Sequence, residues 1–203
     1  MIIRGAFLAL LSISLGLAQH NSSEAQREAR EQYSRLLVNP ARDPWQMPAQ
    51  VVATLNFSSS EVVGLTGDDD GYFARWIAPR VKQTYILASR AAATKKALLE
   101  EVPITIVVVG DLTSPPPTPL QLDTLIVCDM LDQIKDRPTY YLNLLKLLKS
   151  GGRLVVIDFF KNSAPKGLSV PDRSTVLQEL RAAGLRLSAE YTFLPLQFFV
   201  VMR

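Results

Sequence analysis

Nearly continuous apolar runs alternate with amphipathic segments through most of this 203-residue sequence. Continuous apolar runs are typical of strands covered on both faces, whereas strands with one face in water alternate apolar and polar residues. We expect strands at residues 62–63, 84–89, 104–110, 122–129, 153–160, 185–193 and 197–203. Because helical segments separate several of these strands, the order of elements favours a parallel sheet with helices on both sides.

The last two predicted strands depart from this pattern, because only Leu194, Pro195 and Leu196 separate them. A connection this short joins antiparallel neighbours. The sequence therefore predicts a three-layer αβα fold with a doubly wound, mostly parallel sheet of about seven strands, the last of them antiparallel. We also expect a helix over 139–149, with Ser150, Gly151 and Gly152 supplying its C-terminal cap.

Composition and charge exclude several classes of protein. The chain is 48% hydrophobic and 20% charged, which indicates a globular protein, and it is long enough to bury a core without disulfides or metal. The net charge is only +3 and no long basic run is present, so we expect no nucleic-acid partner. Cys128 lies in an apolar run and is predicted to be a buried strand residue. The only histidine, His20, lies near the N-terminus, which leaves no histidine for catalysis or for a metal site.

The N-terminal segment has the pattern of a secretory signal. Arg4 precedes an apolar stretch from about Ala6 to Leu17, and a small-x-small pair ending at Ala18 places cleavage after that residue. The stretch is shorter than the roughly 20 residues of a membrane span. We therefore expect an exported protein, periplasmic or secreted, with no transmembrane domain after cleavage; an uncleaved N-terminal anchor is the alternative. The predicted parts are a signal peptide at 1–18, a polar helix or tether at 19–42 and a folded domain at 43–203.

A strand, a glycine-containing turn and a helix follow one another from Glu61 to Ala78. This order is the first unit of nucleotide-binding α/β folds, in which the turn brings the backbone close to the ligand. The turn lies between Gly67 and Gly71, and three aspartates fill it: Asp68, Asp69 and Asp70. Two interpretations are open: the aspartates cap the following helix at its positive end, or they form an altered ligand site.

Four segments, in their order and spacing, resemble the class I S-adenosylmethionine-dependent methyltransferases, in particular a bacterial subgroup. They are DPWQMPAQVV, VVGLTGDDDGYFARWIA, LDTLIVCDMLDQIKDRPTYYLNLLKLLKSGGRLVVIDF and the C-terminal FLPLQFFVVMR. The resemblance covers about residues 40–203, so that 43–203 is expected to be a methyltransferase-like domain. It implies S-adenosylmethionine as the cofactor and transfer of its methyl group to an acceptor, small or otherwise, that the sequence leaves unknown.

The resemblance also assigns cofactor-binding positions. The first and last glycines of the family's loop match Gly67 and Gly71, while Asp69 replaces the middle glycine. The acid that reaches the adenine in the family matches Asp111. Asp129, after the fourth strand, lies where family members place substrate-side residues, as does Asp132; a solvated turn is the alternative for both.

Two of the three anchoring acids of the family are replaced in this chain. The acid at the end of the first strand falls at Leu65, and the acid that holds the ribose falls at Ala88 or Ser89. Two functions therefore remain possible. One is a methyltransferase, which needs no histidine or cysteine because positioning alone can support the transfer. The other is an exported pseudoenzyme that is kept as a binding or structural domain, which the lost acids, the filled loop and the signal favour.

Overall fold

The computed structural model describes residues 41–68, 71–88, 104–108, 120–164 and 169–203. Contacts divide the chain into two units, Met1–Asn39 and Pro40–Arg203, and every described residue belongs to the second. The predicted signal peptide and the polar helix lie outside the described residues, and so does the segment 90–101, whose composition favours a helix. Within the described ranges, no helix has the length and apolar character needed to cross a membrane.

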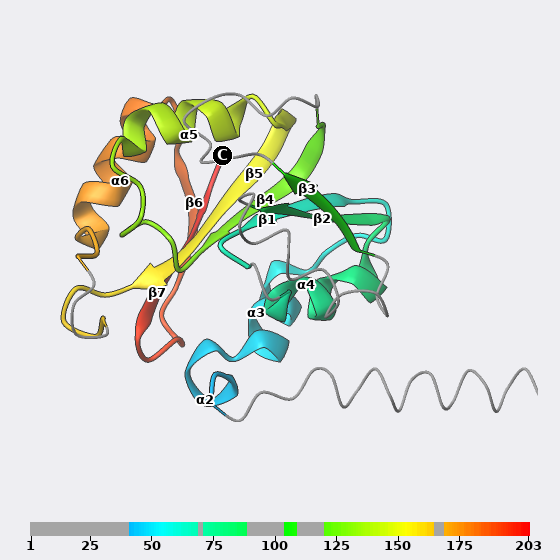
Figure 1. Ribbon diagram of the computed structural model, residues 1–203, viewed down its shortest axis with the longest axis horizontal. Helices are drawn as coiled ribbons and strands as arrows, with labels where there is room; N and C mark the ends of the chain where they lie inside the picture. The colour runs from blue at the N-terminus through cyan, green and yellow to red at the C-terminus, as the bar shows by residue number, and fades with distance from the viewer. Residues whose placement is uncertain (1–40, 69–70, 89–103, 109–119, 165–168) are drawn as a thin grey trace, which may run out of the picture. The chain divides into compact units, whose positions relative to one another are not determined.

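A seven-stranded sheet forms the middle layer of the second unit (Figure 1). The strands are β1 (Val62–Thr66), β2 (Gln83–Ala88), β3 (Ile104–Val108), β4 (Leu122–Cys128), β5 (Leu148–Phe159), β6 (Leu187–Tyr191) and β7 (Gln197–Met202). Their order across the sheet is β3-β2-β1-β4-β5-β7-β6. Neighbours among β1 to β5 pair in parallel, and β7 pairs antiparallel with both β5 and β6. The order of strands reverses at β1 and β4, where such sheets bind ligands.

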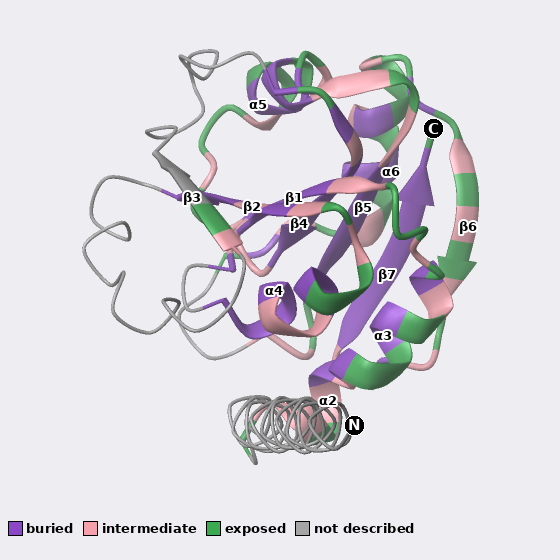
Figure 2. Ribbon diagram, turned by 90° about the vertical axis from the view of Figure 1, so that its right-hand side faces the viewer, coloured by how far each residue is buried: buried purple, intermediate pink, exposed green. Residues whose placement is uncertain are grey.

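Helices cover both faces of this sheet, and each pair of helices packs on its own apolar core. The helices are α2 (Asp43–Gln46), α3 (Pro48–Leu55), α4 (Tyr72–Ile77), the 3₁₀ turn η1 (Ala78–Arg80), α5 (Arg137–Leu145) and α6 (Arg173–Ala182). Buried residues of α3 and α4 belong to one core cluster, and those of α5 and α6 to the other. The central strands are buried between these layers (Figure 2). The predicted fold class, including the antiparallel closing strand, is therefore confirmed.

The prediction for the end of α5 is wrong. The helix ends at Leu145, and Gly151 and Gly152 lie inside β5, where they cap nothing. Leu148 already pairs with β4, and the register shifts before Arg153, so the glycines sit in an irregularity of the strand. Gly151 has a φ of +78°, and a Cβ on Gly152 would lie 3.0 Å from the carbonyl oxygen of Lys149. The two glycines thus let β5 bend while it stays paired.

Gly184 caps the C-terminal end of α6. Gly184 has a φ of +96°, and its N–H donates to the carbonyl of Arg181 at 3.0 Å. The next N–H, from Leu185, reaches the carbonyl of Leu180 at 3.1 Å. This pair of bonds is the Schellman motif, which satisfies the free carbonyls at a helix end.

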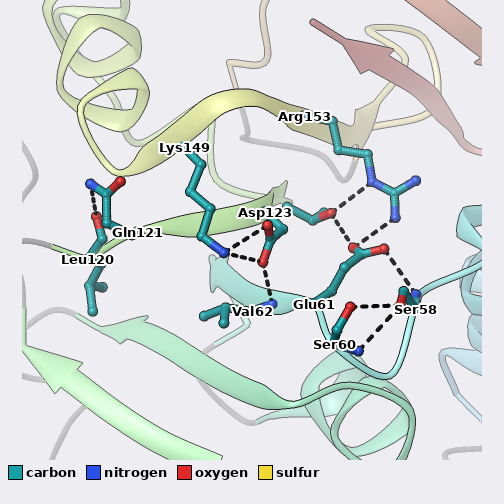
Figure 3. A network of polar contacts seen from close by, with 10 residues as sticks. Ser58, Ser60, Glu61, Val62, Leu120, Gln121, Asp123, Lys149 and Arg153 are labelled. Atoms are coloured by element: carbon teal, nitrogen blue, oxygen red, sulfur yellow. Dashed lines mark hydrogen bonds and ion pairs between the residues drawn. The ribbon is translucent and has the colours of Figure 1, made fainter.

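Two ion pairs, of which only Arg153–Glu61 has little exposure, tie the starts of β1, β4 and β5 together (Figure 3). Arg153 donates to the Thr124 hydroxyl at 2.7 Å and to the carboxylate of Glu61 at 3.2 Å. Nearby, the Lys149 ammonium bonds both carboxylate oxygens of Asp123, at 2.9 and 2.8 Å. These contacts hold the amino ends of three neighbouring parallel strands together. The register of the strands then determines which residues are adjacent at their carboxyl ends.

Candidate functional site

The carboxyl ends of β1 and β4 touch at the point where a ligand is expected. Gly67, just after β1, has a φ of +83°, and a Cβ on it would lie only 1.8 Å from the carbonyl oxygen of Cys128. A side chain therefore cannot fit there, whether or not a ligand binds. Gly71, at the other end of the turn, has a φ of +70° and precedes the first residue of α4. Both predicted loop glycines thus have a structural role of their own.

Asp68 caps α4. Its carboxylate accepts hydrogen bonds from the backbone N–H groups of Phe73 and Ala74, at 2.9 and 2.8 Å. The residue is 1% exposed, and its carbonyl accepts from the N–H of Gly71 at 2.8 Å. The capping interpretation is therefore confirmed for Asp68. Asp69 and Asp70 lie outside the described residues.

Apolar side chains fill the two positions at which the family would place acids on β1 and β2. Leu65 is fully buried, and Ala88 is 2% exposed, within the same core cluster. A carboxylate at Leu65 would be buried among hydrocarbon unless a ligand or another polar group met it. Ser89, the alternative ribose position, and Asp111, the adenine position, both lie outside the described residues.

Asp129 is the predicted site residue with the most unusual surroundings. It directly follows β4 with a φ of +50°, a left-handed conformation that is uncommon outside glycine. One carboxylate oxygen accepts from the side-chain amide of Gln46 at 2.6 Å, and the other accepts from the amide of Gln197. Both glutamines are fully buried. Asp129 therefore joins α2, β4 and β7 at the carboxyl edge of the sheet.

A buried carboxylate, Asp158 in β5, lies close to the partly buried Asp129. It accepts hydrogen bonds from the backbone N–H groups of Leu131 at 3.0 Å, Phe159 at 2.8 Å and Met130 at 3.3 Å. Burial first, and the charge of Asp158 second, raise the pKa of Asp129 to about 7, against an opposing effect of Arg42. Burial also raises the pKa of Asp158 itself. At neutral pH the edge thus holds a carboxyl group poised between its two protonation states.

Residues of α2 and those just before it complete the cover over this edge. Arg42 donates to the side-chain oxygen of Gln46 at 2.6 Å, and its guanidinium lies 4.0 Å from the centre of the Tyr72 ring. The Tyr72 hydroxyl donates to Asp43 at 2.6 Å, and burial together with this bond raises the pKa of Tyr72. Asp129 is thus the inner end of a chain of contacts that holds α2 against the strand ends.

Sequence reasoning missed Gln46 and Gln197. A signal was present, since Gln197 is the only polar residue in the run of β7 and Gln46 lies between Trp45 and Met47. A buried amide in such a run needs a polar partner. Asp132, predicted with Asp129, is partly buried three positions further on, and its charge contributes to the raised pKa of Asp158. No group of three or more His, Cys, Asp or Glu in the described part of the chain could hold a metal ion.

The strand order, the antiparallel closing hairpin and the glycine turn at the reversal of strand order define the fold of the class I S-adenosylmethionine-dependent methyltransferases. A SAM-dependent methyltransferase from Aquifex aeolicus matches with a TM-score of 0.67 and 15% identity, over 85% of this chain and 96% of that one. One from Mesorhizobium loti matches with a TM-score of 0.62 and 15% identity, over 76% and 96%.

A further match is CalO1, a methyltransferase in calicheamicin biosynthesis, in its SAH-bound form. The TM-score is 0.61 and the identity 17%, over 77% of this chain but only 53% of that one. At identities this low, the likeness shows the fold. No protein-family profile and no curated protein sequence matches the chain.

Proposed function

We propose that this chain is a methyltransferase-like protein that transfers no methyl group and serves as a binding or structural domain. The observation that carries the proposal is that the carboxylates of the candidate site are held by other groups of the protein, although Gln197 Oε1 is buried without a hydrogen-bond partner. Asp68 occupies the first N–H groups of α4, and Asp129 is held by Gln46 and Gln197. The predicted signal peptide adds support, because exported compartments do not normally hold soluble cytoplasmic cofactors.

The described residues do not fit S-adenosylmethionine well. The positions of two anchoring acids fall at Leu65 and at Ala88 or Ser89, and the first two of these are buried in a core cluster. A carboxylate of the ligand placed about 4 Å from Asp68 would meet a repulsion of about 4 kcal/mol at an effective dielectric of about 20. That repulsion alone would weaken the binding of the ligand by roughly three orders of magnitude.

A second candidate is an active S-adenosylmethionine-dependent methyltransferase with an unknown acceptor. The fold shared with SAM-dependent enzymes, one of them in an SAH-bound form, favours it. The cofactor also carries an ammonium and a sulfonium group, and the carboxylates Asp68, Asp129 and Asp158 would attract both charges. Such an enzyme would work mainly by holding cofactor and acceptor in line.

Calorimetric titration of the full-length chain with S-adenosylmethionine and with S-adenosylhomocysteine separates the two functions. We expect no heat of binding up to millimolar ligand. Micromolar binding of either compound would overturn the first proposal and favour the enzyme. Weaker but saturable binding would count against the first proposal as well, because a site filled by its own side chains should not saturate.

A triple variant tests where the cofactor site would lie. Leu65→Asp, Asp69→Gly and Ala88→Asp together restore the family's acids and its middle glycine, and we expect cofactor affinity to rise. The matched control carries Leu65→Asn, Asp69→Gly and Ala88→Asn, which keeps the shapes and removes the charges. If the restored protein has the circular dichroism of a folded chain and still does not bind, the site is placed wrongly.

A further inference from the structure

An apolar groove lies between α5 and α6, on the sheet face opposite α3 and α4. Its volume is about 280 Å³, and it is lined by Pro138 and Leu142 from α5, by Gln178, Glu179 and Ala182 from α6, and by Ala183, which follows α6. Leu142 is 51% exposed and is the one exposed large hydrophobic residue among those the structure describes. Since it lies beside a hollow lined by proline and alanine, its apolar surface continues into the groove.

The helices themselves create this groove. Tyr140, Tyr141 and Leu144 of α5 are buried in the core, and Leu142 therefore projects from the opposite side of the helix. Ala182 of α6 and the following Ala183 are too small to fill the space between the helices. Arg137 on α5 forms two hydrogen bonds with the carboxylate of Glu179 on α6, at 2.9 and 2.7 Å. This bidentate pair holds the helices at a fixed separation, so the groove is preformed.

Exposed cations lie at the C-terminal ends of both helices that line the groove, and the exposed acid Asp136 lies at the other end of α5. Lys146 lies one helical turn beyond Leu142 and bonds only the neutral amide of Asn143, at 3.0 Å. Arg181 adjoins Ala182, and Arg186 follows shortly after the helix and pairs through its backbone with Arg203. These four cations are exposed, and none has a carboxylate partner among the described residues. The one acid that lines the groove, Glu179, is neutralised by Arg137.

We propose that this groove binds an acidic amphipathic helix of another protein. A bulky apolar side chain of that helix would pack on Leu142 and over Ala182, and its carboxylates would face Lys146 and Arg181. A second copy of this chain is disfavoured because it would bring the same cations to the contact. The proposal does not depend on the carboxyl ends of β1 and β4, and so it holds whether or not a cofactor binds there.

A displayed library of helical peptides, with all residue types allowed along one face, is the probe for this surface. It is selected on the immobilised full-length chain. We expect the enriched peptides to be acidic and to carry Leu, Phe or Met at helical spacing. Their affinity should fall at least about tenfold with Leu142→Asp, as for an anchor at the centre of an interface. The affinity should also weaken as salt is raised.

Two further variants and one control make the result specific. Ala182→Phe fills the groove without adding charge, and Lys146→Glu reverses one cation; both should reduce binding. Ala49→Asp, exposed on α3 on the other face of the sheet, should leave binding unchanged. Enrichment of basic peptides, or of peptides insensitive to Leu142→Asp and Ala182→Phe, would overturn the proposal.

Other occupants of the groove would give different results. A dimer in sedimentation analysis that Leu142→Asp converts to a monomer would show that a second copy binds there. Flotation with phosphatidylglycerol vesicles that the same variant abolishes would show a membrane surface. Either outcome contradicts the acidic helix. Neither bears on the titration with S-adenosylmethionine, so a failure of this proposal is distinct from a failure of the proposed function.

Discussion

The side-chain amide of Gln46 lies 2.6 Å from a carboxylate oxygen of Asp129, although 83 positions separate the two residues. This contact joins the short helix α2 to the end of β4. It also covers Asp129, so that a carboxyl group is held away from water beside a second one, Asp158. The free energy of unfolding should therefore change with pH up to about 7, where ordinary surface aspartates are already ionised.

Asp129→Asn is expected to flatten the pH dependence of unfolding. The pKa of Asp129 is raised from 3.8 to about 7 in the folded chain, so between these values the folded state keeps a proton that the unfolded state has lost. Protonation thus stabilises the fold at low pH, and that contribution is lost as pH rises through about 7. As pH rises across this window, the free energy of unfolding of the wild type should fall relative to that of the variant by up to about 1.4 kcal/mol per pH unit.

Urea denaturation at several pH values measures this difference. Above the window, Asp129→Asn should be the more stable protein, because asparagine carries no buried charge and tolerates the left-handed backbone of this position. Asp158→Asn is the companion variant, and it should shift the transition of Asp129 to lower pH by removing a neighbouring charge. Equal pH profiles for the wild type and Asp129→Asn would contradict the assignment.

Asp68→Ala should destabilise the fold by about 2–4 kcal/mol, because two buried N–H groups of α4 lose their acceptor. Asp68→Asn keeps one oxygen and should cost less. Asp172→Ala is the matched control, since Asp172 precedes α6 but its side chain accepts no bond from that helix. Its cost should stay below about 0.5 kcal/mol. A similar loss at both positions in urea denaturation would argue against a special role for Asp68.

Gly67→Ala should cost at least about 3 kcal/mol or prevent folding, because the added Cβ would overlap the carbonyl of Cys128. Gly184→Ala offers a comparison with a similar φ and open space around it. There only the left-handed conformation is strained, at about 1–2 kcal/mol. Thermal unfolding of the two variants checks the difference. Equal losses would mean that conformation, and not contact between the strand ends, requires glycine at residue 67.

Arg153→Met should destabilise the fold by about 2–3 kcal/mol, since the side chains of Arg153 and Glu61 are only 15% and 19% exposed and the carboxylate would lose its partner. Combining it with Glu61→Gln should cost less than the sum of the single changes. The pair formed by Lys161 and Asp172, 69% and 53% exposed, should show a coupling below about 1 kcal/mol in the same double-mutant cycle. Additive effects at Arg153 and Glu61 would contradict the role of the pair.

The order of elements could be predicted because it rests on local patterns. Continuous apolar runs marked the strands, and the short link at Leu194 to Leu196 marked the antiparallel hairpin. The prediction failed at Gly151 and Gly152, where a glycine pair after a helix looks the same as a cap. Only the pairing of Leu148 with Leu122 shows that the strand has already begun, and that contact is not local.

The candidate site was predicted only where it rests on local sequence patterns. Capping by Asp68 and the burial of Cys128 follow from nearby sequence, and both are found. The hydrogen bonds from Gln46 and Gln197 to Asp129 join three segments that are far apart in the sequence and adjacent only in the folded chain. Sequence spacing alone does not predict which distant residues will be in contact.

The contact between Gly67 and the carbonyl of Cys128 shows that a loop glycine can be required for packing, whereas a motif search takes the same glycine as a sign of ligand binding. Because this glycine is required where two strands touch, a chain can keep the first glycine of the loop long after any ligand has stopped binding. The glycine therefore reports the packing of the two strand ends, whatever the site binds. Searches for active enzymes of this fold would discriminate better by scoring the carboxylates at the ends of the first and second strands.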